Sequence, residues 1–262
     1  MTASASRWAQ AVLALPKPLL LAFDVDGTLA PFVPDPAAAR VQDSVRQDLQ
    51  GLSRCRGVRL ALITGRDARS LAHVVRVPGA FRGVEHGRVI IAPGDRPHPE
   101  PLTAQERARL RAFEHWARDE VLPAGGHMEK KPRARTAHVR PLLKSHPKLA
   151  RQLLKRAEEV ARDHDLTVRQ GRGVIEAELR SGDKGKALRS IRSRVRAKGV
   201  LFVGDDLTDH PAIAFAHEVG GVGLWVRGGS TGARPKIKSG TLASIEEVHA
   251  LVSQLRQGLA PG

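Results

Sequence analysis

Apolar runs of five or six residues recur along the chain, separated by longer segments with helical periodicity. Three of these runs occupy residues 18–23, 58–63 and 199–203. A continuous apolar run is typical of a strand in a parallel sheet, because helices cover both faces of such a sheet. Strands that alternate with helices imply right-handed crossover connections. The pattern therefore predicts an α/β core. Its further predicted elements are a strand at 222–226 and helices at 6–15, 37–52, 67–75, after 183, after 209 and at 244–256.

The middle of the chain follows another pattern, in which a helix and two strands occur twice. Residues 103–121 read as a helix, since Thr103 can cap it and Glu106, three residues later, completes a capping box. The second predicted helix, 149–163, places Leu149, Leu153 and Val160 on one face. The four strands are predicted near 127–131, 133–140, 166–170 and 173–180. This order is typical of a small α+β module.

The two patterns together predict two domains. We expect a catalytic core built from residues 1–101 and 181–262, into which an α+β domain of residues 102–180 is inserted. The proline-rich segment 93–101 is the predicted hinge between them.

Two carboxylates follow the first apolar run directly. Asp24 and Asp26 emerge at the carboxyl end of the predicted strand, where open α/β sheets bind their ligands. Residues two apart in an extended segment point the same way, so both carboxylates can face one site. Gly27 then permits a sharp exit of the chain, and Thr28 offers a hydroxyl to an anion.

Matching polar residues follow the other strands. The second run ends in Thr64, Gly65 and Arg66, and Lys184 stands at the head of a helical stretch. The third run ends in the acidic stretch 204–209, whose carboxylates belong to Asp205, Asp206 and Asp209. This order of acid pair, hydroxyl, cation and acid cluster resembles the four motifs of the haloacid dehalogenase superfamily of aspartyl phosphotransferases, and the match spans nearly the whole chain.

The resemblance implies a Rossmann-like parallel-sheet core with an inserted cap domain, and an Mg²⁺-dependent phosphatase. It implies that Asp24 is the nucleophile and that Asp26 is the general acid and base. Thr64 and Lys184 would hold the phosphoryl oxygens. The implied ligands of Mg²⁺ are Asp24, the main-chain carbonyl of Asp26, and Asp205. Asp206 and Asp209 would orient metal-bound water and Lys184.

The predicted strands of the inserted domain carry apolar residues on one face and polar residues on the other. An antiparallel sheet that packs on helices by its apolar face turns the other face outward. The outward face is predicted to hold five charged or titratable side chains, those of Glu129, Lys131, His138, Arg140 and Glu176. One interpretation is a solvated face with paired charges. The other is recognition of a polyhydroxylated ligand, because sugar hydroxyls both donate and accept hydrogen bonds.

Within the superfamily, the chain is most similar to the trehalose-6-phosphate phosphatases. The segments 128–132, 137–140, 83–87 and 174–176 resemble motifs of that family. The resemblance implies that Glu129, Lys131 and Glu176 hold the disaccharide, supported by His138 and Arg140. The chain departs from the family pattern at Lys130, which replaces an acid, at Val139, which replaces an aromatic residue, and at His210, which replaces a glutamate.

Two further residues have alternative interpretations. Arg66 binds phosphate or pairs with a neighbouring acid, and His86 binds substrate or stabilises the turn at 83–87. Other substrates also stay open: sucrose 6-phosphate, and mannosyl- or glucosyl-3-phosphoglycerate. An alternative function that is not enzymatic is that of a basic nucleic-acid-binding protein on an inactive phosphatase scaffold.

The composition bears on partners and compartment. The chain has 262 residues and a formal net charge of +16, but its 43 basic residues are spread along the sequence. The spread favours general attraction of anionic substrates over a nucleic-acid-binding face. Aromatic residues make up only 3%, which disfavours stacking on nucleobases. One cysteine, no long apolar stretch and no signal-like start predict a cytoplasmic protein without a membrane as partner. We also expect a monomer that does not bind nucleic acid, and the resemblance implies a small-molecule sugar phosphate as its partner.

Overall fold

The structure, a computed structural model, describes residues 3–33, 38–97, 101–171, 173–179, 182–227 and 239–259. It consists of two compact units, Met1–His98 with Gly182–Gly262, and Pro99–Ser181. Each unit is described by itself. The predicted hinge lies partly outside the described residues, at 98–100, as do both residues of the predicted boundary at 180–181.

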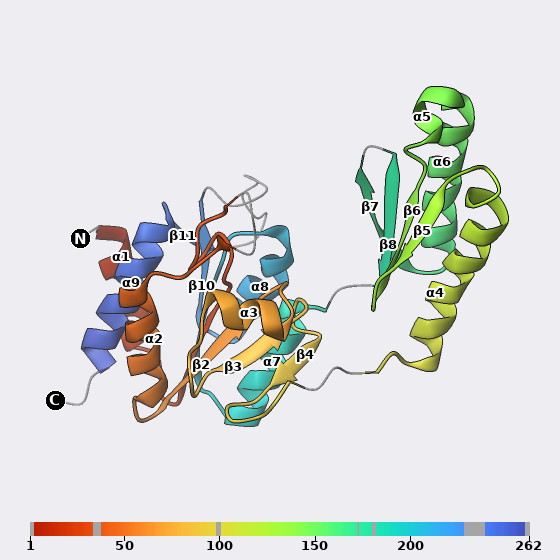
Figure 1. The fold of residues 1–262 in the computed structure, drawn as a ribbon. Helices are drawn as coiled ribbons and strands as arrows, with labels where there is room; N and C mark the ends of the chain where they lie inside the picture. Colours follow the sequence, from red (N-terminus) through yellow and green to blue (C-terminus); the bar gives the residue numbers. More distant parts are fainter. Residues whose placement is uncertain are drawn as a thin grey trace. The chain divides into compact units, whose positions relative to one another are not determined.

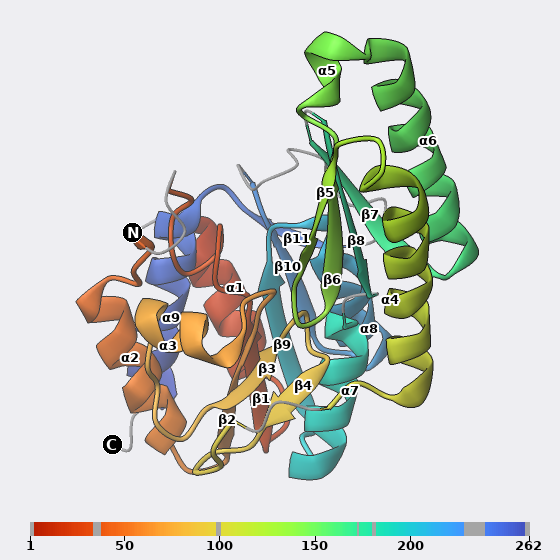
Figure 2. The ribbon, with the colours of Figure 1, turned by 45° about the vertical axis from the view of Figure 1, so that its right-hand side comes forward.

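The first unit is built on a seven-stranded sheet in the order β11-β10-β9-β1-β2-β3-β4 (Figures 1 and 2). All neighbouring pairs are parallel except β3 and β4. The strands are β1 (Leu19–Phe23), β2 (Val58–Ile63), β3 (Phe81–Val84), β4 (Val89–Ile91), β9 (Gly199–Gly204), β10 (Val222–Val226) and β11 (Gly240–Leu242). The parallel sheet confirms the predicted α/β class.

Helices cover both faces of this sheet, as Figure 1 shows. On β1, Leu19, Leu21 and Phe23 belong to one buried cluster, whereas Leu20 and Ala22 belong to another. The helices of the first layer are α1 (Ala3–Leu13), α2 (Asp43–Arg54), α3 (Ala68–Val74) and α9 (Ile245–Leu259). Those of the second layer are α7 (Lys184–Val195) and α8 (His210–Glu218). Because both faces are covered, every residue of β1 is buried, which explains the uninterrupted apolar run.

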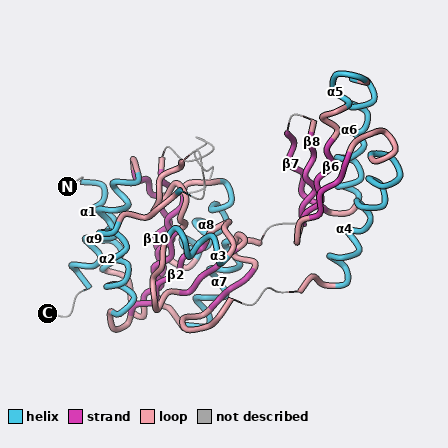
Figure 3. The backbone as a smooth tube through the Cα atoms, in the orientation of Figure 1, coloured by secondary structure: helices cyan, strands magenta, loops and turns pink. Residues whose placement is uncertain are grey.

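The second unit is a four-stranded antiparallel sheet in the order β5-β6-β8-β7, with helices packed on one face (Figure 3). Its elements are α4 (Ala104–Trp116), the π-helical turn η2 (Ala117–Val121), β5 (His127–Lys130), β6 (Ala134–His138), α5 (Leu142–Ser145), α6 (Pro147–Asp163), β7 (Leu166–Gly171) and β8 (Val174–Leu179). The capping box of Thr103 and Glu106 is present at the start of α4, which confirms that prediction.

Four short strands or helices were not predicted: β3, β4, β11 and α5. Each has only three or four residues, too few for a periodic signal. The predicted helix at 37–52 was wrong at its start, because α2 begins at Asp43. Leu149 was also predicted wrongly: Leu153 and Val160 are buried in the core of the second unit, but Leu149 is exposed. No helix among the described residues is long and apolar enough to cross a membrane.

Candidate active site

The predicted nucleophile lies in a buried cluster of opposite charges. Asp24 directly follows β1, and its amide donates to the carbonyl of Val203 on the neighbouring strand β9. Lys184 is the first residue of α7, and its Nζ lies 2.8 Å from Asp24 Oδ1 and 2.7 Å from Asp209 Oδ1. All three side chains are at least 95% buried. The structure therefore brings together two residues predicted to act in catalysis and one predicted to orient Lys184.

Asp209 links this cation to the loop after β9. Its Oδ1 contacts Lys184, while its Oδ2 accepts hydrogen bonds from the amides of Asp205, at 3.0 Å, and Asp206, at 2.9 Å. The carboxylate of Asp206 accepts from the amide of Leu207 and caps the short 3₁₀ helix η3 (Leu207–Asp209). Asp209 thus fixes the acidic loop and the ammonium group together.

Burial dominates the electrostatics of the cluster. It raises the pKa of Asp24 well above its usual value, and the nearby carboxylates of Asp209 and Asp205 add to this rise, although Lys184 opposes it. Burial also disfavours the charged form of Lys184, but the adjacent Asp24 and Asp209 outweigh this effect and raise its pKa above the usual value. Three carboxylates share one ammonium, so the cluster carries excess negative charge.

The same carboxylates form the candidate metal site. Among the described residues, Asp24, Asp205 and Asp209 each offer an oxygen, and these atoms lie within 4.8 Å of one another. Both oxygens of Asp209 already accept hydrogen bonds, so Asp24 and Asp205 are the better candidates for ligands. Mg²⁺ is commonly held by one or two carboxylates together with water and substrate phosphate. The donor set fits this ion.

Gly27 and Thr28 shape the approach to Asp205. Thr28 Oγ1 donates to Asp205 Oδ1 at 2.9 Å. Gly27 has a φ of +80°, and a Cβ at this position would lie 2.6 Å from Cγ of Asp205. The turn after β1 therefore requires glycine, both for its backbone conformation and to leave room for the carboxylate.

The second predicted acid, Asp26, is held by an arginine. Arg66 donates from Nε and Nη2 to the two oxygens of Asp26, at 2.8 and 2.7 Å. Its Nη1 donates to Ser70 Oγ at 2.8 Å. Of the two interpretations of Arg66, the structure shows the pairing with a neighbouring acid. The pairing with Asp26 raises the pKa of Arg66. The role of Ser70 was missed, although its position four residues after Arg66 is the spacing of contacts along a helix.

Thr64 lies between this pair and the turn that carries His86. Thr64 is buried, and its Oγ1 accepts from the amide of Arg66 at 3.2 Å. Its carbonyl accepts from the amide of His86 at 2.8 Å. Glu85 and His86 both have positive φ, so the turn holds an uncommon backbone conformation. The imidazole of His86 packs against Gly65, where an added Cβ would lie 2.6 Å from the ring.

The turn also braces the helix that carries Lys184. The amide of Gly182 donates to the carbonyl of Glu85 at 3.1 Å. A Cβ on Gly87 would lie 2.5 Å from the Cβ of Ala187, which is on α7. The turn at 85–88 therefore couples the segment of Thr64 to that of Lys184, and His86 has a structural role in it.

The outward face of the second unit groups most of the predicted sugar contacts. Lys131 Nζ contacts Glu176 Oε2, which also accepts from Thr136 Oγ1 at 3.1 Å. The contact with Glu176 raises the pKa of Lys131. His138 Nε2 lies 3.5 Å from Glu129 Oε2.

Arg140 is exposed and lies two residues beyond the end of β6. The ring of His138 stacks on that of His127, with 4.2 Å between centroids. The strand register also places Thr136 opposite Glu176, a pairing that the alternation of the strands signals and that the sequence prediction did not use.

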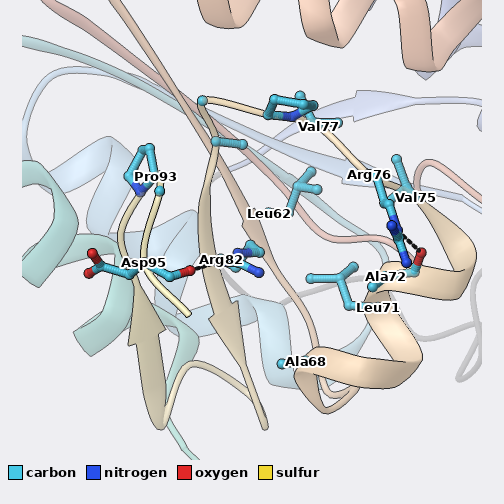
Figure 4. Close-up of a pocket in the computed structure, with 14 residues that line it drawn as sticks. Leu62, Ala68, Leu71, Ala72, Val75, Arg76, Val77, Arg82, Pro93 and Asp95 are labelled. Atoms are coloured by element: carbon cyan, nitrogen blue, oxygen red, sulfur yellow. Dashed lines mark hydrogen bonds between the residues drawn. The ribbon is translucent and has the colours of Figure 1, made fainter. Parts of the chain in front are cut away.

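A cavity of about 320 Å³ lies beside α3, β3 and β4 in the first unit (Figure 4). Leu62, Leu71 and Val75 contribute apolar walls, and Arg82 donates from Nη2 to the carbonyl of Asp95 at 2.8 Å. None of the residues predicted to act in catalysis lines this cavity. The chemistry of the carboxylate cluster, and not the size of a hollow, identifies the candidate active site.

A parallel sheet with an acid pair after β1, a hydroxyl after β2 and an acid cluster after β9 defines a phosphatase-type α/β fold of the haloacid dehalogenase superfamily. Within that superfamily the chain belongs to the trehalose-phosphatase family, whose model matches residues 22–245. This confirms the predicted relationship.

Curated relatives and a solved structure agree with this assignment. The chain is 29% identical over 253 residues to a trehalose-phosphate phosphatase of Mycobacterium leprae, across 91% of this chain and 57% of that protein. It is 27% identical to the trehalose-6-phosphate phosphatase of Escherichia coli, across 90% of this chain and 86% of that protein. A trehalose-6-phosphate phosphatase structure from Aspergillus fumigatus is similar with a TM-score of 0.67 and 25% identity, covering 97% of both chains. The chain spans little more than half of the mycobacterial relative.

Proposed function

We propose that this protein is an Mg²⁺-dependent phosphatase that hydrolyses trehalose 6-phosphate to trehalose and phosphate through an aspartyl phosphate. The observation that carries the proposal is the buried carboxylate of Asp24, which follows β1 and contacts Lys184 at 2.8 Å. Asp26, two residues later, is held by Arg66. A nucleophile, an ammonium group and a second, separately held acid form the set that two-step displacement at phosphorus needs.

In the first step, Asp24 attacks phosphorus and the bond from phosphorus to the sugar oxygen breaks. Asp26 protonates the departing oxygen. In the second step, water attacks phosphorus and the bond from phosphorus to the Asp24 oxygen breaks, which releases phosphate and restores the Asp24 carboxylate, while Asp26 accepts a proton from the water. Lys184 and Thr64 offset charge on the phosphoryl oxygens. Together these groups lower a barrier that is among the highest for uncatalysed reactions, by about 20 kcal/mol or more.

Mg²⁺ would be held by Asp24, Asp205 and the main-chain carbonyl of Asp26. When bound it would neutralise negative charge, so that an anionic ester can approach an anionic nucleophile. Asp206 and Asp209 would orient its water ligands and Lys184, in keeping with the contacts of Asp209 to the cation and to the loop after β9.

We also propose that the outward face of the second unit binds the disaccharide, so that this unit acts as the cap that sets specificity. Glu129 and Lys131 expose about half of their side chains, which leaves them available to a ligand. Carboxylates accept hydrogen bonds from sugar hydroxyls, and the ammonium group donates to them. His138 and Glu176 hold these two groups in place, and Arg140 of the same unit is a further proposed contact. His86, in the first unit, stays a proposed substrate contact.

A panel of phosphate esters tests the function. Released phosphate is measured with trehalose 6-phosphate, sucrose 6-phosphate and glucosyl-3-phosphoglycerate, each with Mg²⁺ and with EDTA. We expect turnover of trehalose 6-phosphate only with Mg²⁺, and none by Asp24→Asn. Cleavage of another ester while trehalose 6-phosphate stays intact would refute the substrate. Undiminished turnover in EDTA, or by Asp24→Asn, would refute the mechanism.

A matched pair of substrates tests the sugar-binding face. Glu176→Gln should raise KM for trehalose 6-phosphate at least tenfold, because it removes the charge that holds Lys131. It should leave kcat/KM for p-nitrophenyl phosphate, which has no sugar, within twofold. Equal loss with both substrates would contradict a role in sugar recognition.

A further inference from the structure

A second cavity in the first unit is lined by cations and lies at the opposite end of the sheet from the candidate active site. We call it the basic pocket; it has a volume of about 470 Å³, and its side chains are those of Lys17, Arg54, Arg56, Arg256, Cys55 and Leu259. Lys17 stands two residues before β1, and Arg56 two residues before β2. Asp24 and Thr64 follow the carboxyl ends of these same strands. The basic pocket is therefore separate from the carboxylate cluster.

The four cations of the basic pocket have no protein partner within the described part of the chain. None of them makes a hydrogen bond or ion pair with a described residue, and no acidic residue lines the pocket. The cavity in Figure 4 differs in this respect, because Arg76 and Arg82 there donate to main-chain carbonyls. Four like charges around one hollow repel one another. An anion bound between them would remove this repulsion.

Helix dipoles explain the position of only two of the four cations. Arg54 and Arg256 stand in the last turns of α2 and α9, where a cation is stabilised by the helix terminus. Lys17 and Arg56 lie outside the helices, in the segments that lead into β1 and β2. The pocket is also shaped around one of its cations, because a Cβ on Gly51 would lie 2.6 Å from Cδ of Arg256. Helix stabilisation therefore does not explain why the four charges converge.

The residue types indicate the ligand. Three of the four cations are arginines, whose planar guanidinium groups match the geometry of phosphate oxygens. Four positive charges are enough to balance two phosphoryl groups. The volume lies in the range of pockets for small molecules. We propose that the basic pocket binds a small anion that carries two or more phosphoryl groups, at a site distinct from the one that hydrolyses the ester.

Thermal unfolding of the full chain tests this, with inorganic tripolyphosphate as the probe, in EDTA and at constant ionic strength. Tripolyphosphate at a hundred times its Kd should raise Tm by about 5 °C or more. The double variant Arg54→Gln with Arg56→Gln should bind at least tenfold more weakly. The control variant, Arg151→Gln with Arg194→Gln, removes the same charge from exposed positions elsewhere and should bind like the wild type. Equal shifts in all three proteins would overturn the proposal, because binding would then be non-specific or confined to the active site.

The single cysteine of the chain gives a second readout that does not depend on a variant. Cys55 lines the basic pocket, so bound tripolyphosphate should slow its labelling by a neutral disulfide reagent at least fivefold. Inorganic phosphate at the same concentration should slow it less than twofold. Labelling unaffected by tripolyphosphate would refute occupancy of the pocket. If inorganic phosphate protects equally well, two phosphoryl groups are not required. If a 20-nucleotide single strand protects at lower phosphate concentration than tripolyphosphate, the site is one for nucleic acid and the proposal fails.

Discussion

Asp209 is a residue whose replacement should damage the candidate active site without touching the nucleophile. Asp209→Asn keeps the size of the side chain and removes one acceptor oxygen. In the wild type, Oδ1 accepts from Lys184, and Oδ2 accepts from the amides of Asp205 and Asp206. The amide group of asparagine must replace one of these oxygens. Its N–H donors then face either an ammonium group or two backbone amides, and donors cannot pair with donors.

The burial of Asp209 sets the magnitude. The side chain is fully buried, so water cannot replace the lost acceptor. Breaking one side of a buried charged pair costs about 3–5 kcal/mol. Part of this cost is offset, because the cluster has three carboxylates for one ammonium and the variant removes one of them. We expect a net loss of about 2–3 kcal/mol in the free energy of unfolding, which corresponds to a fall in Tm of about 5–10 °C for a domain of this size.

The kcat of Asp209→Asn should fall by more than its loss of stability alone would explain. Lys184 loses one of the two anions that fix its position, and loss of one preorganised donor costs about 10²-fold or more in kcat. The assay is phosphate release together with thermal unfolding, and Asp206→Asn is the matched control for thermal unfolding. Asp206 accepts from the amide of Leu207 through Oδ1 and from the hydroxyl of Thr208 through Oδ2. An asparagine keeps the first acceptor, and its amide group can donate to the hydroxyl instead. Asp206→Asn should keep Tm within about 2 °C. If Asp209→Asn keeps the Tm and kcat of the wild type, or if both variants lose equally, the assigned role of Asp209 is refuted.

The remaining predictions concern both units. In α4, burial favours the neutral form of Glu106, but its hydrogen bonds and its pairing with Arg133 outweigh this and lower its pKa to about 2. The stabilisation is thus present above about pH 4.5 and is lost as pH falls towards 2. Glu106→Gln should therefore flatten the dependence of Tm on pH over this range. An unchanged slope would contradict the stabilising role of the Glu106 carboxylate. Gly27→Ala should lower the free energy of unfolding by about 1–3 kcal/mol and remove most of the activity, because Gly27 has a positive φ and a Cβ would meet Asp205. Unfolding and phosphate release measure the two effects. Near-normal stability and activity would show that the turn relaxes to accept the methyl group. Ser70→Ala should lower kcat less than tenfold and leave KM unchanged, since it removes the acceptor of one guanidinium bond; a rise in KM alone would indicate a substrate contact instead.

The fold was predictable wherever burial leaves a periodic signal. β1 and β2 are buried at nearly every position, and their apolar runs, interrupted only by Arg59 in β2, predicted their positions within one residue. The alternation in β8 similarly identified its buried face, which holds Ile175, Ala177 and Leu179. The three-residue strands β4 and β11 bury too little to leave such a signal. β11 pairs with β10, which is distant in the sequence, and β4 pairs with β3 across a tight turn.

The sequence predicted which residues belong to the candidate active site, but not which of them contact one another. The position of Asp24 at a strand end follows from the apolar run before it, and that of Lys184 from the helix cap Asp183. Which acid each cation contacts depends on how the elements pack. Arg66 reaches Asp26 because the two residues follow the carboxyl ends of the neighbouring strands β2 and β1, and no local pattern distinguishes this contact from one to phosphate. The bridging position of Asp209 also follows only from the close approach of the loop after β9 to α7.

The charges of the candidate active site lead to a last prediction about substrate binding. Asp24, Asp205 and Asp209 place three carboxyl groups beside the single ammonium group of Lys184, while Asp26 pairs with Arg66. A phosphate ester that carries two negative charges should therefore be repelled unless a divalent cation is present. Orthovanadate, a phosphate analogue, should bind in Mg²⁺ at least 100-fold more tightly than in EDTA. Asp205→Asn should reduce this difference, since it removes a proposed ligand and one of the excess charges. Equal affinity in Mg²⁺ and EDTA would mean that Lys184 alone attracts the phosphoryl group, and would contradict repulsion of the anion by the excess carboxylates of the cluster.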